Sequence, residues 1–256
     1  MQWLKSLTGA APAAPTPETP RVPDGSRVYA VGDVHGRTDL VRRLLDLIVA
    51  DAAGAPEARR VIVFLGDYVD RGPDVAGTVD LLLQGPPPGF DYVLLKGNHE
   101  DFLLRLLEGT RHLDAWLMNG GIQTLESYGL DMTYLPAAPQ QATRLRQDFL
   151  AALPDDHLAF YRSLGAWHRE GDYLFVHAGV RPGTRIEKQR EEDLLWIRDR
   201  FLESDEDFGQ VVVHGHTIVG TPEVRRNRIG IDTGAWRSGR LTCLALVGDQ
   251  RRFLQT

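Results

Sequence analysis

The chain has 256 residues, a formal charge of −6 and a sequence pI near 5.8. This length can bury a large core, and we expect one folded domain. The acidic balance argues against a nucleic-acid-binding face dominated by basic residues. The single cysteine, Cys243, excludes an internal disulfide and a cysteine-rich zinc site. Its alternating apolar surroundings predict a buried strand position.

Two further classes of segment are missing from the sequence. No run approaches the roughly 18 apolar residues that a membrane span requires. The first seven residues lack the apolar stretch of a signal peptide. We therefore expect a cytoplasmic protein that has no membrane partner. Residues 10–23 are rich in alanine and proline without periodicity, so we assign 1–24 to a flexible arm and 25–256 to the folded domain.

Three strand–loop–helix units are predicted at the start of the folded domain. The expected strands are residues 27–31, 61–65 and 92–95. The expected helices are 40–48, 75–83 and 98–107. Asp74 is expected to cap the second of these helices. This repeated order predicts a parallel sheet with right-handed crossovers.

The second half of the chain begins with a change of pattern. Residues 113–164 are predicted to form a helical insertion, which includes a helix at 142–150. Further strands are expected at 173–176, 211–213, 228–231 and 241–247. We expect the last two to form an antiparallel pair, joined through the turn-rich residues 232–235.

Oxygen or imidazole donors follow five of the predicted strands, at the ends where α/β sheets collect ligands. An isolated aspartate at such a position is usually a helix cap, and an isolated histidine is usually a turn residue. Five strand ends with donors favour a metal site instead. The absence of thiolates favours manganese, iron or zinc over a purely structural zinc site. The candidate ligands are Asp33, His35, Asp67, Asn98, His177 and His214.

The spacing of these donors indicates two metal ions. Asp33 and His35 stand two residues apart, so both can face one ion on an extended segment. We assign Asp67 as the bridge, because a carboxylate can serve two cations at once. Asn98, His177 and His214 would complete the shell of the second ion. Two divalent ions lower the pKa of a bridging water, which predicts hydrolysis by in-line attack of hydroxide on phosphorus.

Further residues are assigned to substrate binding and proton transfer. Arg71, four residues beyond Asp67, can orient a phosphoryl group, although a loop arginine can also pair with a neighbouring carboxylate. His99 follows Asn98 directly, and we assign it as the general acid that protonates the leaving alkoxide. Asp70 is expected to orient His99 and to favour its charged form.

Three positions near the predicted strand ends remain to be assigned. Arg198 is a second candidate phosphate contact, although arginines are routine on helix faces. His216 is expected to point away from the ions, into an outer contact with Thr217. Asp232 either orients a ligand histidine or serves in a turn.

Five motifs of the chain, taken together and in order, resemble the signature of the PPP-type metallophosphoesterases. The match is most similar to the bacterial and phage branch, which is related to phage lambda phosphatase. The resemblance implies a calcineurin-like α/β fold of four layers, in which two mixed sheets are flanked by helices. It also implies Asp33, His35 and Asp67 on one ion, and Asp67, Asn98, His177 and His214 on the other. The motifs are Gly32–Gly36, Gly66–Gly72, Gly97–Glu100, His177–Gly179 and His214–His216.

The family resemblance implies a protein serine/threonine phosphatase with two divalent ions, manganese first and iron or zinc as alternatives. Its expected partner is a phosphoprotein or phosphopeptide. A dinucleoside polyphosphate hydrolase, for example of diadenosine tetraphosphate, is the alternative enzyme, because it shares the two-metal core. The intact Asp70-Arg71-Gly72 and Glu100 favour the protein phosphatases. A non-catalytic scaffold is disfavoured, because no ligand position is replaced.

Overall fold

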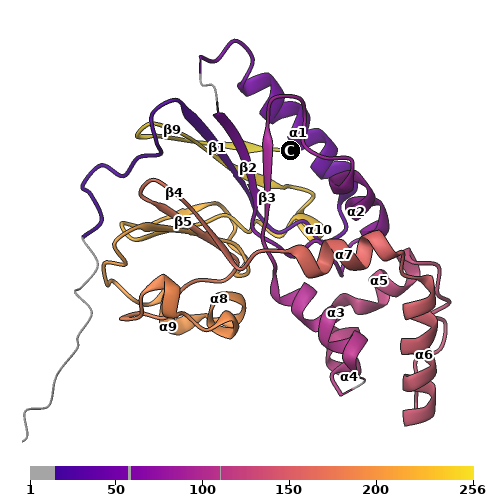
Figure 1. Cartoon of the computed structure of the whole chain (residues 1–256). Coiled ribbons are helices and arrows are strands. Elements are labelled where there is room, and N and C mark those ends of the chain that lie inside the picture. The colour runs from indigo at the N-terminus through magenta and orange to yellow at the C-terminus, as the bar shows by residue number, and fades with distance from the viewer. Residues whose placement is uncertain (1–14, 57–58, 110) are drawn as a thin grey trace, which may run out of the picture.

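The structure is a computed structural model that describes residues 15–56, 59–109 and 111–256. Two five-stranded sheets form its centre (Figure 1). The first sheet runs in the order β10 (Gln250–Gln255), β9 (Thr242–Val247), β1 (Ser26–Val31), β2 (Arg59–Phe64) and β3 (Asp91–Leu94). The second runs in the order β4 (Trp167–Glu170), β5 (Tyr173–Val176), β6 (Val211–His214), β8 (Arg228–Gly230) and β7 (Glu223–Val224).

Both sheets are mixed, as expected. Strands β1, β2 and β3 are parallel, with Ala30 opposite Val63 and Val63 opposite Val93. This confirms the predicted parallel unit. In the second sheet β5, β6 and β8 are parallel, while β4 and β7 pair antiparallel at the two edges. The carboxyl ends of the parallel strands are where ligands are expected in such sheets.

Side chains that alternate along the strands divide the apolar core into layers. In β1, Val28 and Ala30 face the second sheet, whereas Tyr29 and Val31 face the helices. The dry layer between the sheets contains Val61, Val63, Tyr173, Phe175, Val211, Val213 and Ile229. Helices α1 (Thr38–Asp51) and α2 (Val75–Leu83) pack with the outer side of the first sheet. Helices α8 (Glu191–Trp196) and α9 (Asp199–Leu202) pack with the outer side of the second sheet. These layers confirm the predicted α/β fold.

The predicted insertion is helical and packs against α2 and the helix that follows β3 (Figure 1). That helix is α3 (Asn98–Glu108). The insertion contains α4 (Leu113–Trp116), a π-helical turn (Leu117–Gly121), α5 (Ile122–Ser127), α6 (Pro139–Ala152) and α7 (Asp155–Ser163). Trp116, Leu125 and Phe149 are fully buried in the same cluster as the outer residues of β1 and β2. The insertion therefore shares the core of the first sheet.

The predicted antiparallel pair of 228–231 with 241–247 is wrong. Strand β8 lies beside β6 in the second sheet, whereas β9 lies between β10 and β1 in the first. The connecting residues cross from one sheet to the other, and the Thr233 and Thr242 hydroxyls hydrogen-bond across this crossing at 2.7 Å. Both strands are buried. Placing each within a different sheet covers both faces of each strand, which a two-stranded hairpin cannot do.

The described part of the N-terminal arm, residues 15–24, contacts the domain. The Thr16 hydroxyl donates to Asp207 at 2.5 Å, and the Arg21 backbone N–H donates to Asp172 at 2.9 Å. Val22 is fully buried. Residues 1–14 lie outside the described part of the chain. Within the described ranges, no helix combines the length and the apolar content that crossing a bilayer requires.

Candidate metal centre

The loops after β1, β2, β5 and β6 meet at the N-terminus of α3, and their polar side chains are buried together. Five residues of these loops that are not glycine have left-handed backbone angles, with φ between 47° and 70°. Such angles are costly away from glycine and concentrate at functional sites. The strained residues are His35, Asp67, Asp70, Arg71 and His216.

Glycines of the motifs allow these loops to approach one another closely. A Cβ atom at Gly97 would lie 2.1 Å from Asp67 Oδ1, and one at Gly215 would lie 2.0 Å from Asp33 Oδ1. The glycines of the Gly97-Asn98 and Gly215-His216 pairs thus have a steric origin. They leave room for a carboxylate directly beside the neighbouring backbone.

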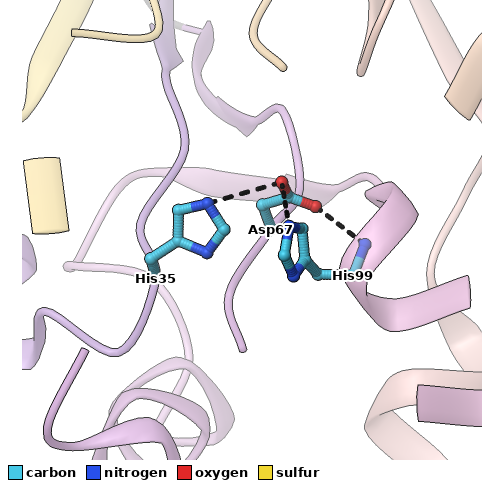
Figure 2. Close-up of side chains that lie close together, drawn as sticks. All are labelled: His35, Asp67 and His99. Carbon is cyan, nitrogen blue, oxygen red and sulfur yellow. Dashed lines mark hydrogen bonds and ion pairs between the residues drawn. The ribbon is translucent and has the colours of Figure 1, made fainter. Parts of the chain in front are cut away.

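The first cluster of donors contains His35, Asp67 and His99 (Figure 2). Asp67 Oδ2 lies 3.5 Å from His35 Nε2 and 3.8 Å from His99 Nε2. The backbone N–H of His99 donates to Asp67 Oδ1 at 3.1 Å, which fixes the carboxylate against α3. The two imidazole rings meet edge to face, 4.7 Å between centroids.

The second cluster of donors lies on the other side of the same carboxylate. Asp67 Oδ1 is 3.4 Å from His177 Nε2. Asn98 Oδ1 lies 2.8 Å from His177 Nε2 and 2.7 Å from His216 Nδ1. Asp67 therefore presents one oxygen to each cluster, which is the arrangement that a bridging ligand requires.

Hydrogen bonds fix the histidine rings in the form that binds metal. His35 Nδ1 donates to the Val69 carbonyl at 2.8 Å, and His177 Nδ1 donates to the Leu65 carbonyl at 2.9 Å. The lone pair of each neutral ring is then on Nε2, directed at Asp67. Burial lowers the pKa of His35 and of His177, so both rings stay neutral, as metal ligation requires.

Asp33 lies beside the clusters and belongs to neither of them. Its carboxylate accepts hydrogen bonds from the His216 backbone N–H at 3.0 and 3.2 Å. Asp232 contacts it directly and also accepts from the Gly234 backbone N–H at 2.8 Å. Burial, followed by the charges of Asp232 and Asp67, raises the pKa of Asp33. Asp232 thus serves in a turn and faces a carboxylate, so it does not orient a ligand histidine.

The prediction that His214 is a ligand and that His216 points away is wrong, because the structure exchanges the two. The His214 ring packs edge to face on Phe201, 5.1 Å between centroids, and its Nδ1 faces the Gly215 carbonyl at 3.1 Å. Alternation along β6 explains this. Val213 faces the layer between the sheets, whereas Val212 faces α9, so His214 continues the outer face. His216, after the turn, returns to the second cluster.

We expect His216→Gln and His214→Gln to differ in metal content. His216→Gln removes an imidazole from the second cluster, so the bound manganese should fall from two ions toward one per chain, with turnover falling in parallel. His214→Gln should retain both ions, because its ring faces Phe201. Elemental analysis after gel filtration measures the stoichiometry, and a melting curve of each variant checks folding. Loss of an ion from His214→Gln but not from His216→Gln would show that His214 is the ligand.

The assigned acid pair and the assigned phosphate arginine lie at the first cluster. His99 Nδ1 donates to Asp70 Oδ2 at 2.6 Å. Burial lowers the pKa of His99, but the carboxylates of Asp67 and Asp70 outweigh this effect and raise it. Arg71 donates from its two terminal nitrogens to His35 Nε2 and His99 Nε2, each at 2.9 Å. The histidine assigned as the acid and a fixed cation thus share one face of the site.

Two other residues complete the surroundings. Arg198 lies at the second cluster. Burial lowers the pKa of His177 and of His216, and the charge of Arg198 lowers both further. Arg198 also donates to the Thr217 hydroxyl at 3.3 Å. Glu100 has a structural role that its motif does not indicate. Its buried carboxylate accepts four backbone N–H groups, from Gly97 and from residues 67–69, at 2.7 to 3.1 Å. Glu100 therefore ties the loop after β2 to the start of α3.

The donor set fits divalent cations. Asn98 Oδ1 and the Nε2 lone pair of His177 face each other at 2.8 Å, and both are acceptors. Three buried carboxylates, Asp33, Asp67 and Asp232, stand close enough to influence one another's pKa. Cations between these groups would satisfy the lone pairs and offset the repulsion. Carboxylate, amide and imidazole ligands without thiolate suit manganese, iron or zinc.

Comparisons with known proteins agree with this chemistry. Residues 26–234 match the calcineurin-like phosphoesterase family. Serine/threonine-protein phosphatase 2 of Escherichia coli is 29% identical over 226 residues, which cover 84% of this chain and 90% of that protein. A symmetrical bis(5'-nucleosyl)-tetraphosphatase of Methylococcus capsulatus is 32% identical over 160 residues, 62% of this chain. The match spans less than half, 45%, of that relative.

Solved structures show the same fold. A putative diadenosine tetraphosphatase superposes with a TM-score of 0.57 at 21% identity, covering 90% of this chain and 93% of that one. The cold-active protein-tyrosine phosphatase of a psychrophilic Shewanella gives 0.54 at 18% identity, covering 98% and 88%. With most of the domain matched by the family and the donors gathered at its strand ends, the chain belongs to the calcineurin-like phosphoesterases.

Proposed function

We propose that the chain hydrolyses phosphoserine and phosphothreonine in proteins or peptides with two bound manganese ions. The observation that carries the proposal is the His99–Asp70 pair at the first cluster, with a 2.6 Å hydrogen bond. The alkoxide of serine or threonine is a poor leaving group and requires a proton, which this pair can supply. A nucleoside phosphate leaves readily without one. A positioned general acid therefore favours a phosphomonoesterase over a dinucleoside polyphosphate hydrolase.

Each residue has a defined place in this reaction. Asp33, which lies beside the clusters, would join His35 and Asp67 on one ion. Asp67 with Asn98, His177 and His216 would hold the other. When bound, the ions lower the pKa of a water molecule and offset charge on the phosphoryl oxygens.

The chain's own polar groups then act on the phosphoryl group and on the leaving oxygen. Arg71 and Arg198 bind phosphoryl oxygens from two sides. In the structure His99 Nε2 accepts a hydrogen bond from Arg71. Once Arg71 binds the phosphoryl group, Nε2 takes up a proton and donates it to the leaving oxygen, while Asp70 holds Nδ1–H and stabilises the charged ring. His99 reverts to the neutral form after this transfer and regains a proton from solvent.

One of the relatives supports a phosphoprotein substrate. The relative named a serine/threonine phosphatase aligns along nearly its whole length, 90%. The proposed partner is accordingly a phosphoprotein or phosphopeptide in the cytoplasm. We also propose that the chain belongs to the bacterial and phage branch related to phage lambda phosphatase, on the basis of its His177-Ala178-Gly179 and Ile231–Gly234 segments.

Hydrolysis of dinucleoside polyphosphates is a second candidate function, and one surface feature favours it. The guanidinium carbons of Arg71 and Arg237 lie 5.6 and 6.0 Å from the centroid of the Trp236 ring. This row extends outward from the first cluster and offers a second cation and an aromatic face. A second phosphate and a base are groups that such a row can bind. Five relatives also carry the name bis(5'-nucleosyl)-tetraphosphatase.

Competing turnover assays separate the two functions. The manganese-loaded protein is given a phosphothreonine peptide or diadenosine tetraphosphate at equal concentration, and kcat/KM is measured for each. The proposal expects the peptide to be the better substrate. A larger kcat/KM for diadenosine tetraphosphate would replace it with the second function. Failure on p-nitrophenyl phosphate as well would contradict both.

A further inference from the structure

The π-helical turn of the insertion lies against the loop that carries Asp70 and Arg71. It spans Leu117–Gly121 and is kinked at Gly120, whose φ is 106°. The Gly120 carbonyl accepts the Arg71 backbone N–H at 3.1 Å. A Cβ atom at Gly120 would lie 2.6 Å from both Arg71 Cγ and Arg71 N.

The two residues that flank this turn complete the hydrogen bonds of Asp70. Trp116, before the turn, donates from Nε1 to Asp70 Oδ2 at 3.0 Å. Thr124, after it, donates from its hydroxyl to Asp70 Oδ1 at 2.6 Å and accepts the Asp70 backbone N–H at 2.9 Å. Asp70, Trp116 and Thr124 are all fully buried. The carboxylate therefore has no freedom to rotate away from His99.

The packing of the turn makes this arrangement rigid. The Trp116 ring lies on Gly121, where a Cβ atom would be 2.4 Å from ring carbon Cδ2. Its other neighbour is Phe149 of α6, 6.1 Å between ring centroids. Gly120 has non-helical backbone angles, so the chain bends between α4 and α5. Trp116 and Thr124, on either side of this bend, both reach the Asp70 carboxylate.

We propose that Trp116 and Thr124 are positioning residues for proton donation, and that the turn between them positions Arg71. They act through Asp70, which they hold so that His99 directs Nε2 at the leaving oxygen. The insertion is thus part of the machinery for substrates whose leaving group needs a proton. This inference rests on the proposed function in assigning His99 as the acid.

Two threonine variants and one tryptophan variant test the positioning role. Thr124→Val keeps the shape and removes both hydrogen bonds, Thr124→Ser keeps the hydroxyl, and Trp116→Phe keeps a ring without the N–H donor. Hydrogen bonds to a charged group are worth enough that Thr124→Val should lower kcat on a phosphothreonine peptide about 10-fold. Turnover of p-nitrophenyl phosphate, whose leaving group needs no proton, should stay within about 2-fold. Thr124→Ser should restore the peptide rate, and Trp116→Phe should show the same selectivity as Thr124→Val.

A matched control separates positioning from general loss of stability. Thr78 is also fully buried, and its hydroxyl donates to the Asp74 carbonyl at 2.9 Å, away from Asp70. Thr78→Val should affect both substrates equally, if at all, and melting curves of all variants identify any that fail to fold. Equal losses on peptide and aryl phosphate in Thr124→Val, or no loss on either, would overturn the positioning role.

The failure of the proposed function has a different signature. If the wild type hydrolyses aryl phosphates but no phosphopeptide, the substrate assignment is wrong while the positioning role stays testable. A series of aryl phosphates graded in leaving-group pKa then serves as the readout. Rates of Thr124→Val should fall more steeply than wild-type rates as the leaving group becomes poorer. Parallel slopes would reject the positioning role on these substrates as well.

Discussion

Asp67→Asn is expected to lower kcat on p-nitrophenyl phosphate by about 10³-fold and to remove at least one of two manganese ions. The wild-type carboxylate faces one cluster with each oxygen, 3.5 Å from His35 Nε2 and 3.4 Å from His177 Nε2. An amide of the same shape has a single oxygen ligand and no charge. It can neither join two cations nor offset their repulsion. Elemental analysis and steady-state rates at saturating manganese provide the two measurements.

An aspartate outside the two clusters offers a matched control for this substitution. Asp193 pairs with Arg181 at 2.9 Å, and the Asp193 side chain is 15% exposed. Asp193→Asn changes the same charge but touches neither cluster, so metal content and rate should stay close to those of the wild type. If Asp67→Asn kept both ions and a rate within about 3-fold of wild type, the bridging assignment would fail.

His99→Asn should produce a selective defect. Loss of a general acid costs roughly 10²–10⁴-fold where the leaving group needs a proton. We therefore expect that loss with a phosphothreonine peptide and a much smaller one with p-nitrophenyl phosphate. The hydrogen bond from Nδ1 to Asp70 and the position of Nε2 beside Asp67 motivate this expectation. Rates with both substrates are measured at saturating manganese.

The same variant distinguishes an acid from a metal ligand. His99 is grouped with His35 and Asp67 by the distances between their donor atoms. If His99 were a ligand, His99→Asn would lower the metal content and would impair both substrates alike. Retention of two ions together with the selective defect supports the acid. Equal losses on both substrates would remove His99 from that role.

Most of the helices and strands, and most residues of the site, could be predicted from local sequence patterns. Apolar runs followed by a donor, with a glycine between them after β1 and β2, indicated the strands β1, β2 and β5. The Gly97-Asn98 pair indicated the start of α3 in the same way, because strand period and turn chemistry are local properties. The spacing of Asp67, Asp70 and Arg71 within one motif likewise needed no tertiary information. The structure places all three at the first cluster, with Asp70 on His99 and Arg71 between the two imidazoles.

Other features were open to sequence analysis but were missed. Alternation in β6 shows that His214 shares the face of Val212, which identifies His216 as the residue that returns to the centre. The segment 223–224 was too short to predict, and without it the antiparallel partner of β8 could not be assigned. A donor's position along the chain thus places it near a strand end. Whether its side chain points to one face of the sheet or the other depends on the alternation of side chains along the strand.

Tertiary structure alone decided how distant segments act on one another. Nothing in residues 113–127 indicates that Trp116 and Thr124 form hydrogen bonds with Asp70, about fifty positions earlier. The four backbone N–H groups that donate to Glu100 likewise come from two separate loops. The sheet to which β8 or β9 belongs was equally hidden. The physical reason is that strand pairing and buried hydrogen bonds depend on partners far away in sequence. Periodicity and propensity describe only neighbours along the chain.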